Sequence, residues 1–138
     1  MQEGEFLKSL QDYTNLSGCP IATGFKILGK RWTIEIIREI LLGSVKFNGI
    51  HRAVPGINPR MLSLRLKELV DHGLVKRTVS AGTPVDIRYS LTKSGQDLIP
   101  VMFAMAKFSM KNFPEMVFRD GSDRTPEQVL REIGVSKK

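Results

Sequence analysis

The short segment Pro55-Gly56-Ile57 constrains the fold of this 138-residue chain more than any other, because it separates two stretches with helical spacing. In residues 46–54 the apolar side chains recur at helical intervals. Beyond the segment, Asn58 is a good N-cap and Pro59 suits a first helical position, so a second helix is expected over 59–72. Two helices joined by a tight, glycine-containing turn are typical of a helix-turn-helix.

The flanking segments predict further helices and one hairpin. Helical spacing indicates helices over residues 3–13 and 20–28, and Thr33 is expected to act as the N-cap of a third helix that ends before Gly43. After the helix-turn-helix, two β-branched runs joined by AGTP predict an antiparallel hairpin over about residues 75–91.

The C-terminal third is also expected to be helical. Thr92 should cap a long helix over about 93–113, but Pro100 lies so deep in it that we expect a kink or a later start. The apolar side chains of this helix fall on one stripe: Leu98, Met102, Met105 and Phe108. Thr125 and Gln128 have the spacing of a capping box on a small terminal helix.

Together these elements predict a mainly α protein with a small β-hairpin (α+β), that is, a winged helix-turn-helix with flanking N- and C-terminal helices. The length suits one domain with its own core. Within residues 1–138 we expect the helix-turn-helix at about 46–72, the wing at about 75–91, a C-terminal helix at about 93–113 and an extra tail at 114–138.

The expected helix 59–72 has two different faces. At about 100° per residue, one face gathers the apolar side chains Leu62, Leu66, Leu69 and Val70 and should pack on a core. The opposite side carries Arg60, Leu64, Lys67 and Glu68, flanked by Met61 and Ser63. A surface helix normally fills such a face with charged residues alone, so an outward leucine is unexpected.

A helix-turn-helix gives this outward face a chemical role, because its second helix enters the major groove of DNA. Arg60 could reach a guanine edge or a phosphate, and Ser63 can donate to either. Leu64 could pack on a thymine methyl group, although a single exposed leucine needs no explanation. Lys67 lies one turn further on and suits a phosphate.

The positive charge gathers in the same region. Residues 44–95 contain nine Lys or Arg and three Asp or Glu, so they carry most of the net charge of +7. Lys76, Arg77 and Arg88 lie on or near the hairpin, where a wing would follow the DNA backbone or minor groove. Ordinary strand-exposed charge remains the alternative for each of them.

Several kinds of function find no support in the sequence. There is no CxxC, no HExxH, no glycine-rich phosphate loop and no GxSxG. We therefore expect no enzyme, no metal site and no cofactor. The N-terminus does not have the pattern of a secretory signal, and the most apolar stretch, 98–106, is too short to cross a membrane. A soluble cytoplasmic protein, associated with the nucleoid, is expected.

Some motifs are more specific than a generic helix-turn-helix. They are Cys-Pro at 19–20, Gly-Lys-Arg-Trp at 29–32, Pro-Gly-Ile followed by Arg-Met-Leu within 55–62, and Tyr-Ser-Leu-Thr at 89–92 with Gly95. Over about residues 19–108 the chain therefore resembles the HxlR family of winged helix-turn-helix transcription regulators, relatives of the MarR group. Leu64 departs from the family pattern, in which a polar residue is usual.

The resemblance implies a homodimeric regulator. The N- and C-terminal helices would form the dimer interface, with Met102, Met105 and Phe108 in it, whereas an intramolecular core is the alternative for that stripe. A twofold dimer would place two recognition helices about 34 Å apart on a palindromic DNA operator.

The resemblance also makes Cys19 a candidate sensor of oxidants, electrophiles or another small effector, because some family members sense them through the Cys of the Cys-Pro pair. A thiol beside a helix N-terminus has a stabilised thiolate. The alternative is a small buried apolar residue, which is commoner for a free cysteine.

We thus expect a sequence-specific regulator that binds double-stranded DNA. The residues expected at the DNA are Lys46, Asn58, Arg60, Met61, Ser63, Leu64, Lys67, Lys76, Arg77 and Arg88. Two other functions stay open: a nonspecific or architectural nucleic-acid binder, and a winged-helix module that binds proteins. The outward face of helix 59–72 favours specific DNA binding, since binding to the backbone alone needs only Lys and Arg.

Overall fold

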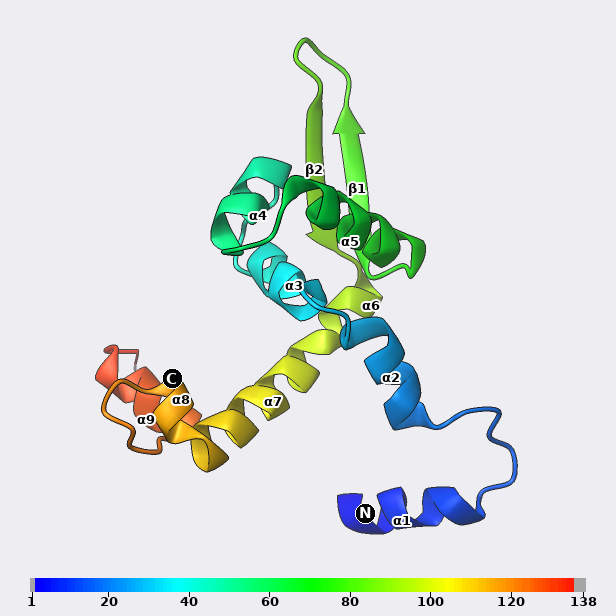
Figure 1. Cartoon of the computed structure of the whole chain (residues 1–138), viewed down its shortest axis with the longest axis vertical. Helices are drawn as coiled ribbons and strands as arrows, with labels where there is room; N and C mark the ends of the chain where they lie inside the picture. Colours follow the sequence, from blue (N-terminus) through cyan, green and yellow to red (C-terminus); the bar gives the residue numbers. More distant parts are fainter. Residues whose placement is uncertain (1, 136–138) are drawn as a thin grey trace. The chain divides into compact units, whose positions relative to one another are not determined.

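The computed structural model describes residues 2–135 of the chain, which divides after Leu91 into two compact units. The first unit contains α1 (Glu3–Ser9), the 3-10 helix η1 (Leu10–Asp12), α2 (Pro20–Leu28), α3 (Thr33–Leu41), α4 (Phe47–Ala53), α5 (Pro59–Asp71), β1 (Val75–Ser80) and β2 (Asp86–Leu91). The second contains α6 (Lys93–Gln96), α7 (Leu98–Asn112), α8 (Pro114–Val117) and α9 (Pro126–Glu132). This mostly helical structure with one hairpin confirms the expected fold class (Figure 1).

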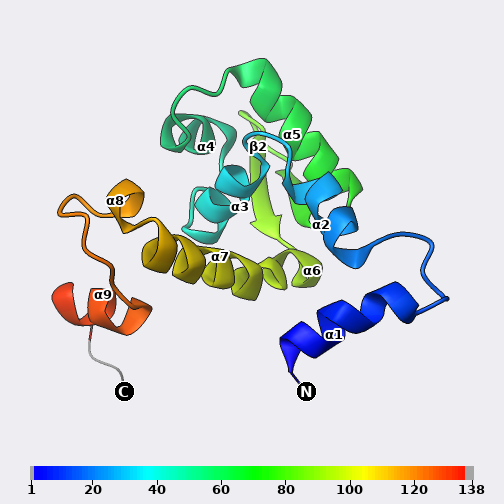
Figure 2. The same ribbon diagram turned by 60° about the horizontal axis from the view of Figure 1, so that its bottom comes forward.

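The core of the first unit lies where α3, α4 and α5 meet the hairpin. In both views α4 and α5 lie beside the strands (Figures 1 and 2). The completely buried side chains come from all of these elements: Ile36, Ile37, Ile50, Leu62, Leu66, Leu69 and Val75. Three of the four apolar residues predicted for the inner face of α5 are therefore buried, and Val70 is half-buried.

The hairpin is antiparallel, with Val75 opposite Leu91 and Ser80 opposite Asp86. It is fastened to the helices by its base, because Val75 and Tyr89 are buried and the Tyr89 N–H donates to the carbonyl of Val45 at 2.8 Å. The distal part projects past the helices (Figure 1). A wing held at one end leaves the outer parts of both strands exposed.

The start of α3 differs from the expectation. Trp32, not Thr33, is the N-cap, and Trp32 has a left-handed backbone with φ of 79°. This turn places Thr33 inside the first turn of α3, where its side chain is buried and its Oγ1 has no hydrogen-bond partner among the described residues. Thr33 therefore cannot cap the helix as the sequence suggested.

Other predicted boundaries are confirmed. Thr92 caps α6 by accepting from the Gly95 N–H at 3.0 Å, and the helix restarts at Leu98. Pro100 thus lies in the first turn of α7, where its missing N–H costs no helical hydrogen bond. The capping box of Thr125 and Gln128 on α9 is also present. None of the helices within residues 2–135 has the length and hydropathy needed to span a bilayer.

The two leucines that face opposite sides of α5 should differ sharply in their effect on stability. Leu66 is 1% exposed and Leu64 is 46% exposed. We expect Leu66→Ala to lower the free energy of unfolding by about 2–5 kcal/mol, because it leaves a cavity in the core. Leu64→Ala should change it by less than about 0.5 kcal/mol. Urea titration of both variants, followed by circular dichroism, measures this; equal losses would contradict the assignment of the two faces.

Candidate nucleic-acid interface

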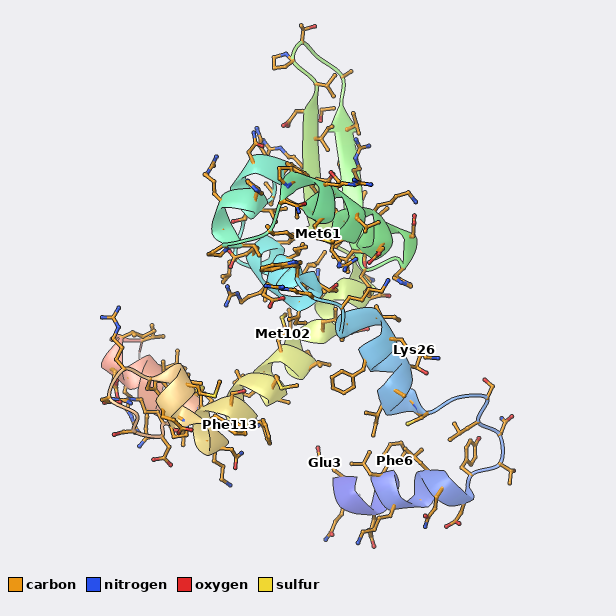
Figure 3. All side chains as sticks on the ribbon, viewed as in Figure 1. Glu3, Phe6, Lys26, Met61, Met102 and Phe113 are labelled. Atoms are coloured by element: carbon orange, nitrogen blue, oxygen red, sulfur yellow. The ribbon has the colours of Figure 1, made fainter. Side chains whose placement is uncertain are left out.

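The first turns of α5 present a cluster of exposed side chains just beyond the tight turn. Asn58 Oδ1 accepts a hydrogen bond from the Met61 N–H at 2.8 Å and so satisfies one of the unpaired donors of the first turn. Arg60, Ser63 and Leu64 are exposed, and Met61, labelled in Figure 3, is half-buried. Asn58 therefore acts on the helix backbone, while the other residues form the surface.

A groove of about 310 Å³ runs between α5 and the hairpin. It is lined by Ser63, Leu66, Lys67, Val70, Arg77 and Tyr89. Ser63 and Lys67 come from the helix, and Arg77 comes from β1. The structure thus brings together predicted site residues from the two elements, with a hydroxyl, an ammonium and a guanidinium group along one groove.

The predicted basic residues of the wing lie on different faces of the hairpin. Arg77 pairs with Tyr89, whereas Lys76 pairs with Ser90 and Thr78 pairs with Arg88. Because side chains alternate along a strand, Lys76 and Arg88 lie on the face opposite to Arg77. All three are exposed, but Arg77 alone of them shares the groove with α5.

Some of the basic residues are already paired within the chain. Asp86 holds two of them, because Lys46 Nζ lies 3.2 Å from its Oδ1 and Arg88 Nε lies 2.8 Å from its Oδ2. The Arg88 guanidinium and then the Lys46 ammonium lower the pKa of the Asp86 carboxyl, so this carboxylate stays charged. These two cations would reach a phosphate in competition with Asp86.

Lys67 is paired as well, but loosely. Its Nζ lies 2.9 Å from Asp71 Oδ2 one turn later, and both side chains are well exposed. Such surface pairs contribute little and exchange readily for another anion. Arg60, Lys76 and Arg77, in contrast, have no ion-pair partner within residues 2–135 and are free for a ligand.

Two charged residues of α5 are less exposed than the sequence predicts, and they pair with each other. Glu68 was expected on the outward face, but its side chain is only 25% exposed and pairs with Lys30 and Arg65. Arg65, counted with the basic segment, is 13% exposed at its side chain. The spacing of three residues between Arg65 and Glu68 could have indicated their pairing. Nothing in the sequence points to Lys30.

The apolar stripe of α7 is not buried within its own unit. No residue of α7 is buried, and Met105 and Phe108 are about half exposed while Met102 is half-buried. The Phe108 ring lies 5.8 Å from that of Phe113. The second unit therefore displays apolar surface along its longest helix.

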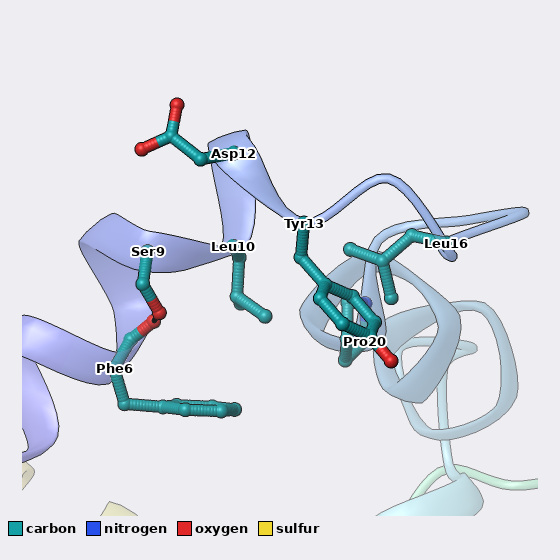
Figure 4. Close-up of a pocket in the computed structure, with 7 residues that line it drawn as sticks. All are labelled: Phe6, Ser9, Leu10, Asp12, Tyr13, Leu16 and Pro20. Carbon is teal, nitrogen blue, oxygen red and sulfur yellow. Dashed lines mark hydrogen bonds between the residues drawn. The ribbon is translucent and has the colours of Figure 1, made fainter.

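Cys19 is exposed at the start of α2, which contradicts the alternative of a buried apolar residue. It lies at a pocket of about 370 Å³, together with residues of η1 and the loop that follows. A neighbouring pocket of about 420 Å³ is lined by Phe6, Ser9, Leu10, Asp12, Tyr13, Leu16 and Pro20 (Figure 4). Within residues 2–135 no cluster of His, Cys, Asp or Glu could hold a metal ion.

Known proteins similar to this chain are helix-turn-helix transcriptional regulators. Residues 27–117 match the family model described as HxlR-like helix-turn-helix. The chain is 46% identical over 83 residues to the uncharacterized HTH-type transcriptional regulator YvaP of Bacillus subtilis (strain 168), which covers 60% of this chain and 77% of YvaP.

Two solved structures are also similar. The reduced form of the transcriptional regulator YodB from B. subtilis has 36% identity and a TM-score of 0.63, covering 70% of this chain and 95% of that one. The redox regulator HypR in its reduced form has 32% identity and a TM-score of 0.63, covering 66% of this chain and 90% of that one.

The shared carboxylate of Asp86 generates a prediction. Asp86→Asn should release Lys46 and Arg88, so affinity for an unrelated DNA duplex should rise and the slope of log affinity against log salt should steepen by about 1 to 2, one per added phosphate contact. Binding measured by fluorescence anisotropy at several salt concentrations tests this. Asp12→Asn, in η1, changes the net charge equally and serves as the control. Equal changes of affinity and salt slope in both variants would show that the net charge of the chain, not the release of Lys46 and Arg88, causes the effect.

Proposed function

We propose that this chain, which belongs to the HxlR-like helix-turn-helix family, binds double-stranded DNA sequence-specifically as a homodimer and so regulates transcription. The family consists of transcriptional regulators, not enzymes. The recognition helix is α5, which enters the major groove, and the wing formed by β1 and β2 follows the backbone or the minor groove.

The observation that carries the proposal is the outward face of α5. Arg60, Ser63 and Leu64 are exposed on the first turns of a helix whose other face is the core of the unit. A guanidinium, a hydroxyl and an apolar group match the guanine edge, the base-edge acceptors and the thymine methyl group that the major groove displays. A binder of the backbone alone would need only positive charge there.

The remaining predicted residues have supporting roles in this proposal. Lys67 and Arg77, on the groove between α5 and the wing, suit phosphates, and so do Lys76, Lys46 and Arg88. Asn58 caps the start of the helix, and Met61 is half-buried next to the outward residues in sequence. In this proposal the residues on the first turns of α5 contact bases, and the other basic residues contact phosphates.

Dimerisation is supported by exposed apolar surface on the terminal helices. Phe6, Ile21, Phe25, Met105 and Phe108 are each about half exposed, which is unusual for side chains of this size on one small chain. A twofold dimer that covers them would present two copies of α5 about 34 Å apart to a palindromic operator. In this arrangement α7 is the C-terminal dimerisation helix, and no role is assigned to the tail after it.

The test is selection of duplex DNA from a random pool, with binding repeated at two salt concentrations. An inverted repeat with half-sites about one helical turn apart is the expected result. Recovery of no motif together with a steep salt slope would instead support a nonspecific binder. No binding at low salt would favour a protein-interaction module.

Arg60 and Lys76 should affect this binding differently. Arg60→Ala is expected to weaken binding to the selected motif by about 1–3 kcal/mol and to leave unrelated duplexes nearly unchanged, because a base contact is lost. Lys76→Ala should weaken all duplexes similarly and reduce the salt slope by about 1. Titration of both variants on both duplexes measures the contrast, and a uniform loss for Arg60→Ala would contradict base reading.

A response to oxidants or electrophiles through Cys19 is a second proposal, supported by the exposure of its thiol and by the similarity to the redox regulator HypR. Reactivity requires access to the thiolate, which an exposed residue provides. Mild peroxide treatment of the folded protein should add oxygen to Cys19 or join two chains, as measured by mass spectrometry with Cys19→Ser as control. An unmodified Cys19 would contradict the proposal.

A further inference from the structure

The connection between α2 and α3, residues 29–32, lies beside α5 and is bonded to it by polar contacts (Figures 1 and 2). Arg65, in the middle of α5, donates from its Nε to the backbone carbonyl of Arg31 at 2.9 Å. The same guanidinium donates from Nη1 to both carboxylate oxygens of Glu68, at 3.1 and 3.3 Å. Arg65 thus links a carbonyl of the connection to a carboxylate of its own helix.

Glu68 completes this network from the other side. Its Oε1 accepts from Arg65 and also from Lys30 Nζ at 3.3 Å, so a second residue of the connection is held. The side chains of Arg65 and Glu68 are 13% and 25% exposed, whereas that of Lys30 is 49% exposed. Arg65 is therefore shielded from solvent and is bonded within the chain through both Nε and Nη1.

A separate contact fastens the connection to the segment that enters α5. Trp32 has a left-handed backbone, and the Arg31 guanidinium lies 4.4 Å from the centroid of its ring. The ring packs against Gly56, where an added Cβ would lie 3.3 Å from Trp32 Cη2. Gly56 also has a positive φ of 90°, so its backbone strongly favours glycine. Residues 30–32 therefore touch both the entry to α5 and its middle.

We propose that Arg65 and Glu68 are positioning residues for DNA recognition, which orient α5 on the core through residues 30–32 without touching DNA. The guanidinium is suited to this because its planar fork fixes the direction of each bond that it donates. The Lys30–Glu68 pair is half-exposed at Lys30 and contributes little to stability, whereas the shielded bonds of Arg65 fix the direction between α5 and residues 30–32. This proposal rests on the proposed function, because it assigns a purpose to the orientation of α5.

The sign of the electrostatic effect makes the proposal testable. Glu68→Gln removes a negative charge and raises the net charge from +7, which by itself should strengthen binding to any DNA. A positioning role instead requires that Glu68→Gln weakens binding to the selected motif relative to binding to other DNA. We expect the ratio of specific to nonspecific affinity to fall by about three- to tenfold, the size of effect typical of residues that act through a packed network.

Asp71→Asn is the matched control. It makes the same chemical change one turn further along α5, in an exposed pair with Lys67 that does not reach residues 30–32. It should raise or preserve affinity for both duplexes. A second variant, Arg65→Lys, keeps the net charge but loses the Nε donor to Arg31, and should lower the same ratio.

The experiment titrates full-length wild type and the three variants on the selected motif and on an unrelated duplex. Thermal unfolding by circular dichroism first establishes that each variant is folded at the temperature of the titration. Trp32, the only tryptophan of the chain, supplies an independent signal, because its fluorescence emission should change in Glu68→Gln and Arg65→Lys and stay constant in Asp71→Asn.

The outcomes separate this proposal from the proposed function. Failure of the wild type to select any motif contradicts the proposed function, and the positioning role with it. Selection of a motif, with an unchanged affinity ratio in folded Glu68→Gln and Arg65→Lys, contradicts the positioning role alone. A reduced affinity ratio in both variants, together with no reduction in Asp71→Asn, supports the positioning role.

Discussion

The burial of one face of α5 is the constraint on which the rest of the structure depends. Leu62, Leu66 and Leu69 are at most 1% exposed, and they hold the helix against α3 and the hairpin. A helix with one face so fully buried must present its other face, and the first turns of that face carry Arg60, Ser63 and Leu64. The same packing sets the groove in which Ser63 and Lys67 meet Arg77 from the wing. The packing of α5 on the core therefore determines which of its side chains are exposed to a ligand.

The net charge of +7 overstates what is available to a polyanion. Arg65 is committed to Arg31 and Glu68, while Lys46 and Arg88 share Asp86. Pairs that are exposed can exchange their carboxylate for a phosphate at little cost, whereas the shielded Arg65 guanidinium would have to break its bonds to Arg31 and Glu68. The positive charge of the basic segment therefore divides into residues that contact a ligand and residues that maintain geometry.

Local features were predictable from the sequence, and contacts between distant segments were not. The cap at Asn58, the box at Thr125 and the hairpin depend on neighbouring residues, and the structure confirms them. The left-handed Trp32, which displaced the expected cap at Thr33, depends on a non-glycine backbone conformation that has no sequence signal. The bond between Lys30 and Glu68 joins residues 38 positions apart, so no periodicity could indicate it. The exposure of Cys19 likewise required coordinates.

The most direct test of α5 as the helix that reads DNA is dimethyl sulfate footprinting on the selected motif. This reagent methylates guanine N7 in the major groove and adenine N3 in the minor groove, so it distinguishes the two grooves. We expect protection of guanine N7 in two half-sites about one helical turn apart, and loss of that protection in Arg60→Ala. Protection of adenine N3 alone, or of no base at all in the bound complex, would contradict it.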